Sequence, residues 1–197
     1  RFYFNGERLI CVVGNYGDQG SEYRTEIDSF SRFTLLGGDQ DSGSSWWKVE
    51  TKSGLILELG NSADSKVISQ LVGAPASWDI SRACDTLGNY YSVSWSGVTS
   101  AGNNHITNRH VASVAYTGND TQGLSPYCFL DFNYETRTDA SFAYHPSGTG
   151  FDNNQRLNSI TVRTGGSVNH TYILDYGISH QSGRSILLSV IKQSAGG

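Results

Sequence analysis

The chain has 197 residues and a formal net charge of −4, without the basic run that nucleic-acid binding requires. Charged residues make up only 16% of it, whereas strand-forming aromatics are common, with 11 Tyr, 8 Phe and 4 Trp. This composition is typical of a secreted or cell-surface all-β protein. The longest apolar run, residues 9–13, is too short to cross a membrane, so we expect no direct membrane insertion.

Turn signals between apolar runs divide the chain into successive hairpins. The chain begins at Arg1 inside such a run, without Met, and we interpret it as a fragment of a longer protein. Hairpin turns are predicted at Asn5-Gly6 and at residues 52–54, 86–89 and 165–166. Long strands are predicted over residues 110–118, 125–137 and 185–193, and loops over residues 15–20, 37–45, 97–104 and 146–154.

No stretch of the sequence has the periodicity of an amphipathic helix, although residues 64–71 could hold one short helical turn. No loop is long enough, or distinct enough in composition, to link two domains. The pattern therefore predicts an all-β fold of successive antiparallel hairpins, which form either a β-sandwich-like structure or a shell-forming sheet. We treat residues 1–197 as a single β domain.

The stretch YRTEIDSFSRF, residues 23–33, has charged side chains at alternate positions. Four of them would share one face of a continuous strand: Arg24, Glu26, Asp28 and Arg32. The Cα atoms of Glu26 and Asp28 would then lie about 6.6 Å apart, a spacing that suits the two carboxylates of an inverting glycoside hydrolase. The arginines favour ionised carboxylates, however, and a general acid must be protonated. We therefore predict a structural ion-pair strand, with a polysaccharide-active enzyme as an alternative.

The loop GGDQDSG raises the question of a metal site. Glu50 follows Asp39 by eleven residues, with Asp41 between them, a spacing similar to that of a calcium-binding EF-hand loop. Flanking helices are missing from the pattern, and Ser44 stands where that loop requires its turn glycine. A weak calcium site at Asp39, Asp41 and Glu50 is therefore the one cofactor that the residues suggest, and otherwise we expect none.

The four tryptophans are candidates for a platform on which sugar rings stack: Trp46, Trp47, Trp78 and Trp95. Aromatic residues in strands more often pack in the core or against a neighbouring strand. Core packing is therefore our interpretation, and glycan stacking is the alternative.

The cysteines and histidines give little sign of chemistry. Cys11 lies in the longest apolar run and is predicted to be a buried free thiol, whereas Cys84 and Cys128 could pair in an exported protein. Their spacing and that of the histidines differ from known metal sites, and no catalytic or phosphate-binding motif is present. Asn119-Asp120-Thr121 matches the glycosylation sequon, a match that a chain rich in Asn and Thr produces by chance.

Five blocks of sequence, in order, are similar to one known family. They are YRTEIDSFSRF, VETKSGLILELGNSADSKV, WDISRACDTLGNYYSVSW, YTGND with LSPYCFLDFNYETR, and RLNSITVRTGG with YILDYG and SGRSILLSV. They resemble the SpvB-type N-terminal region shared by the Salmonella virulence protein SpvB, the B component of bacterial insecticidal toxin complexes and related Rhs/YD-repeat proteins. The blocks span nearly the whole chain.

The resemblance implies a β-rich scaffold of secreted toxins. In the B components this region contributes to a hollow β-sheet shell that, together with a partner component, encloses a separate toxic enzyme. In SpvB the actin ADP-ribosyltransferase lies in a different domain, so no catalytic residue is carried over to this chain.

We therefore expect a non-enzymatic scaffold that encloses or presents a separate toxic domain. Its partners would be further β repeats of the same chain or a partner toxin component. Onward strand pairing predicts open sheet edges at residues 1–4 and 185–193. The alternative is a secreted carbohydrate-binding module or adhesin, assisted by calcium, that uses the tryptophans and the loop around Asp39 and Asp41.

Overall fold

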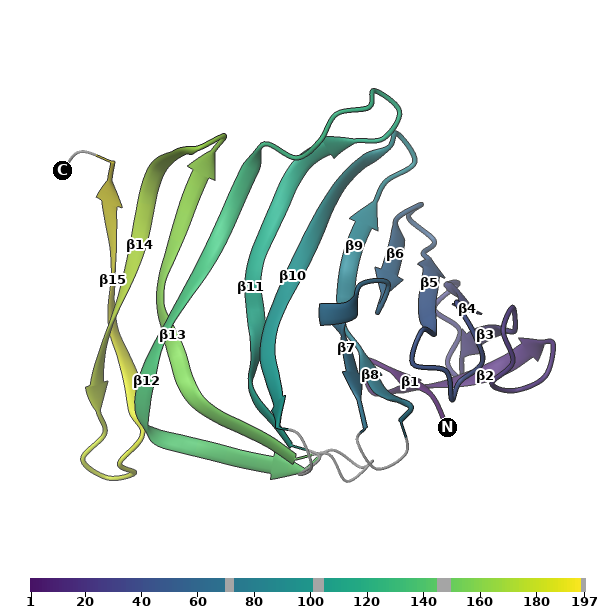
Figure 1. Ribbon diagram of the computed structural model, residues 1–197, viewed down its shortest axis with the longest axis horizontal. Helices are drawn as coiled ribbons and strands as arrows, with labels where there is room; N and C mark the ends of the chain where they lie inside the picture. Colours follow the sequence, from purple (N-terminus) through teal and green to yellow (C-terminus); the bar gives the residue numbers. More distant parts are fainter. Residues whose placement is uncertain (70–72, 101–104, 145–149, 196–197) are drawn as a thin grey trace. The chain divides into compact units, whose positions relative to one another are not determined.

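The computed structural model describes residues 1–69, 73–100, 105–144 and 150–195, and these residues are almost entirely β-strand (Figure 1). The first nine strands are β1 (Tyr3–Phe4), β2 (Glu7–Val13), β3 (Glu22–Thr25), β4 (Arg32–Leu36), β5 (Trp46–Glu50), β6 (Ile56–Leu59), β7 (Lys66–Ile68), β8 (Pro75–Trp78) and β9 (Ile80–Cys84). The others are longer: β10 (Asn89–Ser100), β11 (His105–Asn119), β12 (Cys128–Tyr144), β13 (Gly150–Thr164), β14 (Ser167–Ile178) and β15 (Ser185–Ser194).

Hydrogen bonds join thirteen of these strands in chain order, from β1 to β6 and then from β9 to β15. β7 and β8 form a separate two-stranded sheet, so β6 pairs directly with β9. Neighbouring strands run antiparallel, except that the first residues of β11 also pair in parallel with β13. The sheet does not close on itself, and the predicted all-β fold of successive antiparallel hairpins is confirmed.

The chain forms two compact units, which are described separately below. Unit 1 comprises residues 1–92 together with residues 119–123, and unit 2 comprises residues 93–118 and 124–197. Among the described residues, no helix has the length and apolar character needed to cross a membrane. The interpretation of residues 1–197 as a single domain remains a prediction.

Local sequence signals locate the hairpin turns correctly. Asn5 and Gly6 have φ angles of 50° and 86°, which a two-residue hairpin turn of type I′ requires, and Phe4 pairs with Glu7 across it. Gly165, with φ of 58°, lies in the turn between β13 and β14. A short helical turn is present as a 3₁₀ helix, η1 (Ala63–Ser65), but it begins before the predicted residues 64–71, of which residues 66–68 form β7.

The continuous strand predicted over residues 23–33 is wrong, because the chain turns there. β3 ends at Thr25 and β4 begins at Arg32. The Thr25 hydroxyl accepts a hydrogen bond from the backbone N–H of Ser29 (2.9 Å), and the Asp28 carboxylate accepts one from that of Phe30 (2.7 Å). Phe30 adopts a left-handed conformation with φ of 58°. These side chains thus compete with the strand ladder for the backbone N–H groups.

Two predicted loops are also partly strand. β10 continues to Ser100 and β13 begins at Gly150, so the loops predicted over residues 97–104 and 146–154 are shorter than expected. Residues 101–104 and 145–149 of these loops lie outside the described residues. The strand predicted from residue 125 begins only at Cys128, whereas those predicted over residues 110–118 and 185–193 lie within β11 and β15.

The core of unit 1 lies on one face of β2 to β5. Its buried side chains are Leu9, Tyr23, Phe33, Leu35, Trp47 and Val49. Within β4 and β5 the core residues are two apart, so they point to the same face. The Trp47 ring makes edge-to-face contacts with Phe2, Tyr23 and Trp78, with centroids 4.8, 5.1 and 6.0 Å apart. The Tyr23 hydroxyl accepts a hydrogen bond from Gly17 N–H (2.7 Å), so its polar atom is satisfied within the core.

Unit 2 has long strands and little fully buried apolar surface. Among its described residues, Val93 and Ile106 are the buried hydrophobic side chains. β12 bulges between Thr136 and Ser141, where four residues face a single residue of β13, and the strand changes direction there (Figure 1). The bulge therefore bends β12, and we call this bend, at residues 136–141, the β12 corner.

Candidate functional site

The four charged residues predicted to share one strand face are divided between two strands and a turn. Arg24 donates a hydrogen bond to the Ser31 carbonyl (3.2 Å), and Asp28 shapes the turn. Glu26 is 3.8 Å from Arg8 on β2, and Arg32 is 2.5 Å from Glu50 on β5. Glu26 and Arg32 therefore form ion pairs with other strands, and Glu26 and Asp28 lie in a turn rather than along one strand face.

The three carboxylates of the proposed calcium site do not come together. Glu50 pairs with Arg32 at the opposite end of the β4–β5 hairpin from the loop that carries Asp39 and Asp41. Burial alone would raise the pKa of Glu50, but hydrogen bonds from Arg32 and Lys48 outweigh it and hold the pKa below its ordinary value. Asp39 accepts a hydrogen bond from Gln19 N–H (2.8 Å). Across the described residues, no three His, Cys, Asp or Glu side chains are grouped as a metal site requires.

The structure places the four tryptophans in different surroundings. Trp47 is in the core of unit 1, and Trp78 contacts it and donates a hydrogen bond to the Ser45 carbonyl (2.8 Å). Trp46 lies against Gly37, and Trp95, in unit 2, stacks with the Arg109 guanidinium (4.9 Å). The core interpretation is right for Trp47, and Trp78 packs against the same core. Glycan stacking stays a prediction.

All three cysteines are free. The Cys84 thiol lies 3.3 Å from the Asp85 carbonyl, and the Cys128 thiol lies 3.7 Å from the Thr164 hydroxyl, so neither is in a disulfide. Cys11, expected to be buried, is partly exposed near the end of β2, with its thiol 3.4 Å from the Val13 carbonyl.

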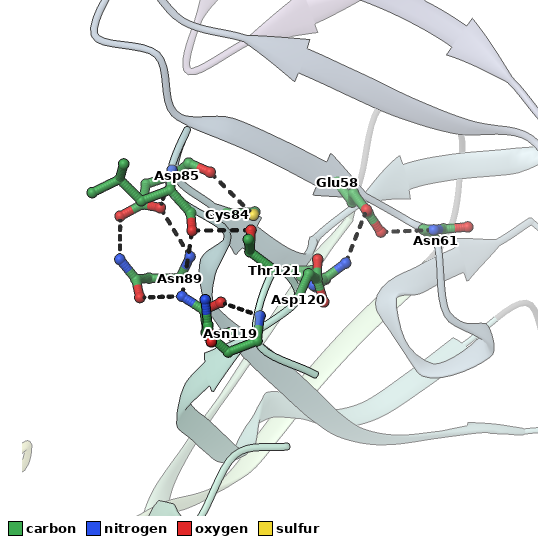
Figure 2. A network of polar contacts seen from close by, with 11 residues as sticks. Glu58, Asn61, Cys84, Asp85, Asn89, Asn119, Asp120 and Thr121 are labelled. Atoms are coloured by element: carbon green, nitrogen blue, oxygen red, sulfur yellow. Dashed lines mark hydrogen bonds and ion pairs between the residues drawn. The ribbon is translucent and has the colours of Figure 1, made fainter. Parts of the chain in front are cut away.

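Figure 2 shows a polar network within unit 1 that joins the turn at residues 85–89 to the segment at residues 119–121. Asn119 donates from its side-chain amide to the Asn89 amide oxygen (2.7 Å) and to the Leu87 carbonyl (3.3 Å). The backbone N–H of Asp120 donates to the Gly88 carbonyl (2.9 Å). The segment that carries the glycosylation sequon therefore has a structural role.

Charged side chains strengthen the same network. The Asp120 carboxylate forms an ion pair with Arg82 (2.5 Å), which also lies 3.8 Å from Glu58. Asp85 accepts hydrogen bonds from the Asn89 side chain and from the backbone N–H groups of Asn89 and Leu87, all 2.9 Å long. These bonds, led by that of the Asn89 side chain, lower the pKa of Asp85. The network thus fastens residues 119–121 to unit 1.

A second polar cluster holds the β12 corner in unit 2. Arg137 donates two hydrogen bonds to Asp139, each 2.8 Å long. Asp139 also accepts bonds from the backbone N–H (2.8 Å) and the hydroxyl (2.7 Å) of Ser185, the first residue of β15. Arg156 connects this group to β13, because it bonds both the Ser185 hydroxyl (2.8 Å) and Glu135 (2.7 Å). The cluster therefore ties β12, β13 and β15 together.

The Asp139 side chain is only 6% exposed. The hydrogen bonds that its carboxylate accepts, first those from Arg137 and then those from Ser185, hold its pKa well below the ordinary range. A lowered folded-state pKa stabilises the fold above the unfolded-state pKa of about 3.9. We therefore expect wild type to be more stable than Asp139→Asn at pH 7, with the difference shrinking as the pH falls below about 4. Urea denaturation of both proteins between pH 7 and pH 2 measures this difference.

The control for this prediction is the same pair of proteins in an Arg137→Met background. The difference between Asp and Asn at position 139 should be smaller there at pH 7, because the principal donor is gone. If the difference in stability between wild type and Asp139→Asn were as large at pH 2 as at pH 7, the lowered pKa of Asp139 would not be its cause.

β15 is an open edge of the sheet, as the sequence predicts. It pairs with β14 and with no other strand among the described residues. Val190 and Ile191 are 54% and 55% exposed, and successive residues of a strand point to opposite faces. Ile186, Leu187 and Leu188 are exposed as well. β15 therefore has both an unpaired edge and uncovered aliphatic side chains on both faces. β1 is the opposite end strand, which confirms the first predicted edge.

Folds similar to this antiparallel sheet are present in solved structures of an effector protein and of toxin complexes. The structure of the N-terminal domain of the effector protein SpvB from Salmonella typhimurium strain LT2 matches with a TM-score of 0.77 and 14% identity, over 97% of this chain and 79% of that one. The predicted SpvB-type region is therefore confirmed as a fold.

Toxin-complex structures have the same fold within far longer chains. A TcdB2-TccC3 crystal structure matches with a TM-score of 0.67 and 13% identity, over 94% of this chain and 13% of that one. The Photorhabdus luminescens Tc holotoxin pore matches with a TM-score of 0.70 and 14% identity, over 94% and 12%. No family model matches the chain, and no curated protein matches it by sequence.

Proposed function

We propose that this chain is a non-enzymatic β scaffold of a secreted toxin-like protein, which pairs onward through its sheet edges and helps to enclose or present a separate toxic domain. Its partners are further β repeats of the same polypeptide or a partner toxin component. The observation that carries the proposal is β15, because a strand with aliphatic side chains exposed on both faces is suited to burial between other layers. The fold shared with SpvB and Tc structures supports it.

The rival functions have less support. The carboxylates that a polysaccharide-active enzyme would use lie in an exposed turn, where Glu26 pairs with Arg8 and Asp28 holds the backbone. Of the tryptophans proposed for a glycan platform, Trp47 is buried in the core of unit 1 and Trp78 packs against it. The scaffold that we propose needs no catalytic residue and no cofactor.

Self-association of the chain tests the open edge. We expect the 197-residue chain to associate as its concentration rises, and Val190→Lys to weaken this association about tenfold or more, equivalent to about 1.4 kcal/mol, because lysine blocks edge pairing. Sedimentation velocity over a concentration series measures the change. Hydrogen exchange should show new protection of the β15 amides in the associated form.

Leu124→Lys is the matched control, because Leu124 is 54% exposed, as Val190 is, and lies outside the strands. It should leave the association unchanged. A wild-type chain that stays monomeric in concentrated solution, or one that associates without protecting β15, would count against the proposal.

A further inference from the structure

A cavity of about 340 Å³ lies within unit 2, at the β12 corner. Five strands contribute to its lining, including His110 from β11, Tyr134 from β12, Gln155 from β13, Tyr176 from β14 and Ser185 from β15. Its volume is at the small end of the range of about 300–1,000 Å³ for ligand pockets. It therefore suits a ligand of the size of one or two sugar rings.

The cavity is electrically balanced. Its two guanidinium groups are both neutralised, since Arg137 pairs with Asp139 and Arg156 with Glu135. Burial, followed by the charge of Arg109, lowers the pKa of His110 below its ordinary value, which favours the neutral imidazole at pH 7. A cavity without net charge offers no electrostatic advantage to an anion or a cation, because a charged ligand would lose its hydration without a counter-charge. A neutral polar ligand is favoured instead.

Some of the polar side-chain groups in the cavity have no hydrogen-bond partner among the described residues. Neither the Gln155 side-chain amide nor the His110 ring nitrogens hydrogen-bond to another group in the described part of the chain. An amide and a neutral imidazole can each both donate and accept a hydrogen bond. Sugar hydroxyls do the same, so they complement these groups and can replace the water that would otherwise solvate them.

The apolar part of the cavity is rigid. The Tyr134 ring stacks on His110 with centroids 3.5 Å apart, and its hydroxyl donates to the Val111 carbonyl (2.8 Å). The Tyr176 ring stacks under the Arg156 guanidinium (4.4 Å), and its hydroxyl donates to the Leu157 carbonyl (2.6 Å). These contacts fix the walls before any ligand binds, which lowers the entropic cost of binding.

We propose that this cavity binds a neutral sugar residue, which hydrogen-bonds to Gln155 and His110 and packs beside Leu157 and the ring edges of Tyr134 and Tyr176. The site is different from the tryptophan platform and does not depend on the scaffold role. The sugar would be the terminal residue of a glycan that reaches the open side of the corner.

A glycan array probed with the 197-residue chain tests the proposal, followed by calorimetric titration with the methyl glycoside of the terminal sugar that binds best. We expect His110→Phe, which keeps the stack on Tyr134 but removes the ring nitrogens, to weaken binding about tenfold or more. Gln155→Ala should do the same. The matched control is Gln181→Ala, an exposed glutamine in the turn between β14 and β15 of the same unit, which should leave affinity unchanged.

A second readout does not depend on the variants. The ring-proton NMR signals of His110 should shift when the methyl glycoside is added to the wild-type chain, with saturation at the calorimetric affinity. The proposal is overturned by an array on which no neutral glycan binds, by binding that both cavity variants retain, or by His110 signals that do not move.

Discussion

Trp47→Ala should lower the free energy of unfolding of unit 1 by about 3–5 kcal/mol, the cost typical of deleting a large buried aromatic side chain. Trp47 is 4% exposed and touches Phe2, Tyr23 and Trp78. Its removal leaves a cavity in the middle of this cluster and takes away three edge-to-face contacts. Urea denaturation followed by far-ultraviolet circular dichroism measures the loss without relying on tryptophan fluorescence.

Trp46 is the matched control, because it precedes Trp47 on β5 and points to the opposite face. It is only half-buried, against Gly37, so Trp46→Ala should cost less than half as much as Trp47→Ala. Equal losses for the two variants would mean that the core does not lie on the Trp47 face of the sheet.

Gly60→Ala should destabilise unit 1 by about 2–5 kcal/mol, from two separate causes. Gly60 has φ of 77°, where an L-residue costs about 1–2 kcal/mol. An added Cβ would also lie 2.3 Å from the Trp78 ring, which contacts Trp47 and bonds Ser45, and overpacking of this kind costs about 1–3 kcal/mol. The midpoint of urea denaturation should fall, and the Trp78 side-chain NMR signals should shift.

Gly20→Ala separates the two causes, because Gly20 has a similar φ of 83° but no atom within 4 Å of the added Cβ. It should therefore cost only the backbone strain, about 1–2 kcal/mol. If Gly60→Ala costs no more than Gly20→Ala, Trp78 is not held against the backbone at Gly60.

The features that the sequence predicts correctly depend on neighbouring residues. Asn5 and Gly6 alone specify their hairpin turn, and apolar residues two apart, such as Trp47 and Val49, identify the buried face of β5. The same logic failed for residues 23–33, because alternation there continues through a turn. Hydrogen bonds that the Thr25 and Asp28 side chains accept from backbone N–H groups interrupt the strand without changing the pattern of polar and apolar residues.

The polar clusters could not be predicted, because their members are distant in sequence. Asp139 and Ser185 are 46 residues apart and meet only because β12 bulges, a feature that leaves no periodic signal. His110 and Gln155 likewise line one cavity from separate strands. For Asn119 the sequon was a visible signal, but it pointed to glycosylation rather than to a hydrogen-bonded segment.

The membership of residues 119–123 in unit 1 has a consequence for dividing the protein. β11 up to Gly118 and the whole of β12 belong to unit 2, so unit 1 is not encoded by one continuous stretch of chain. A fragment that stops at Ser92 would lose Asp120 and leave Arg82 without its 2.5 Å ion-pair partner. Unit 1 can therefore not be released intact by a single cut, whereas a cut after Ser92 keeps every residue of unit 2 on one fragment. A shortened gene product or a proteolytic nick at this point would damage the first unit even though most of its residues remain.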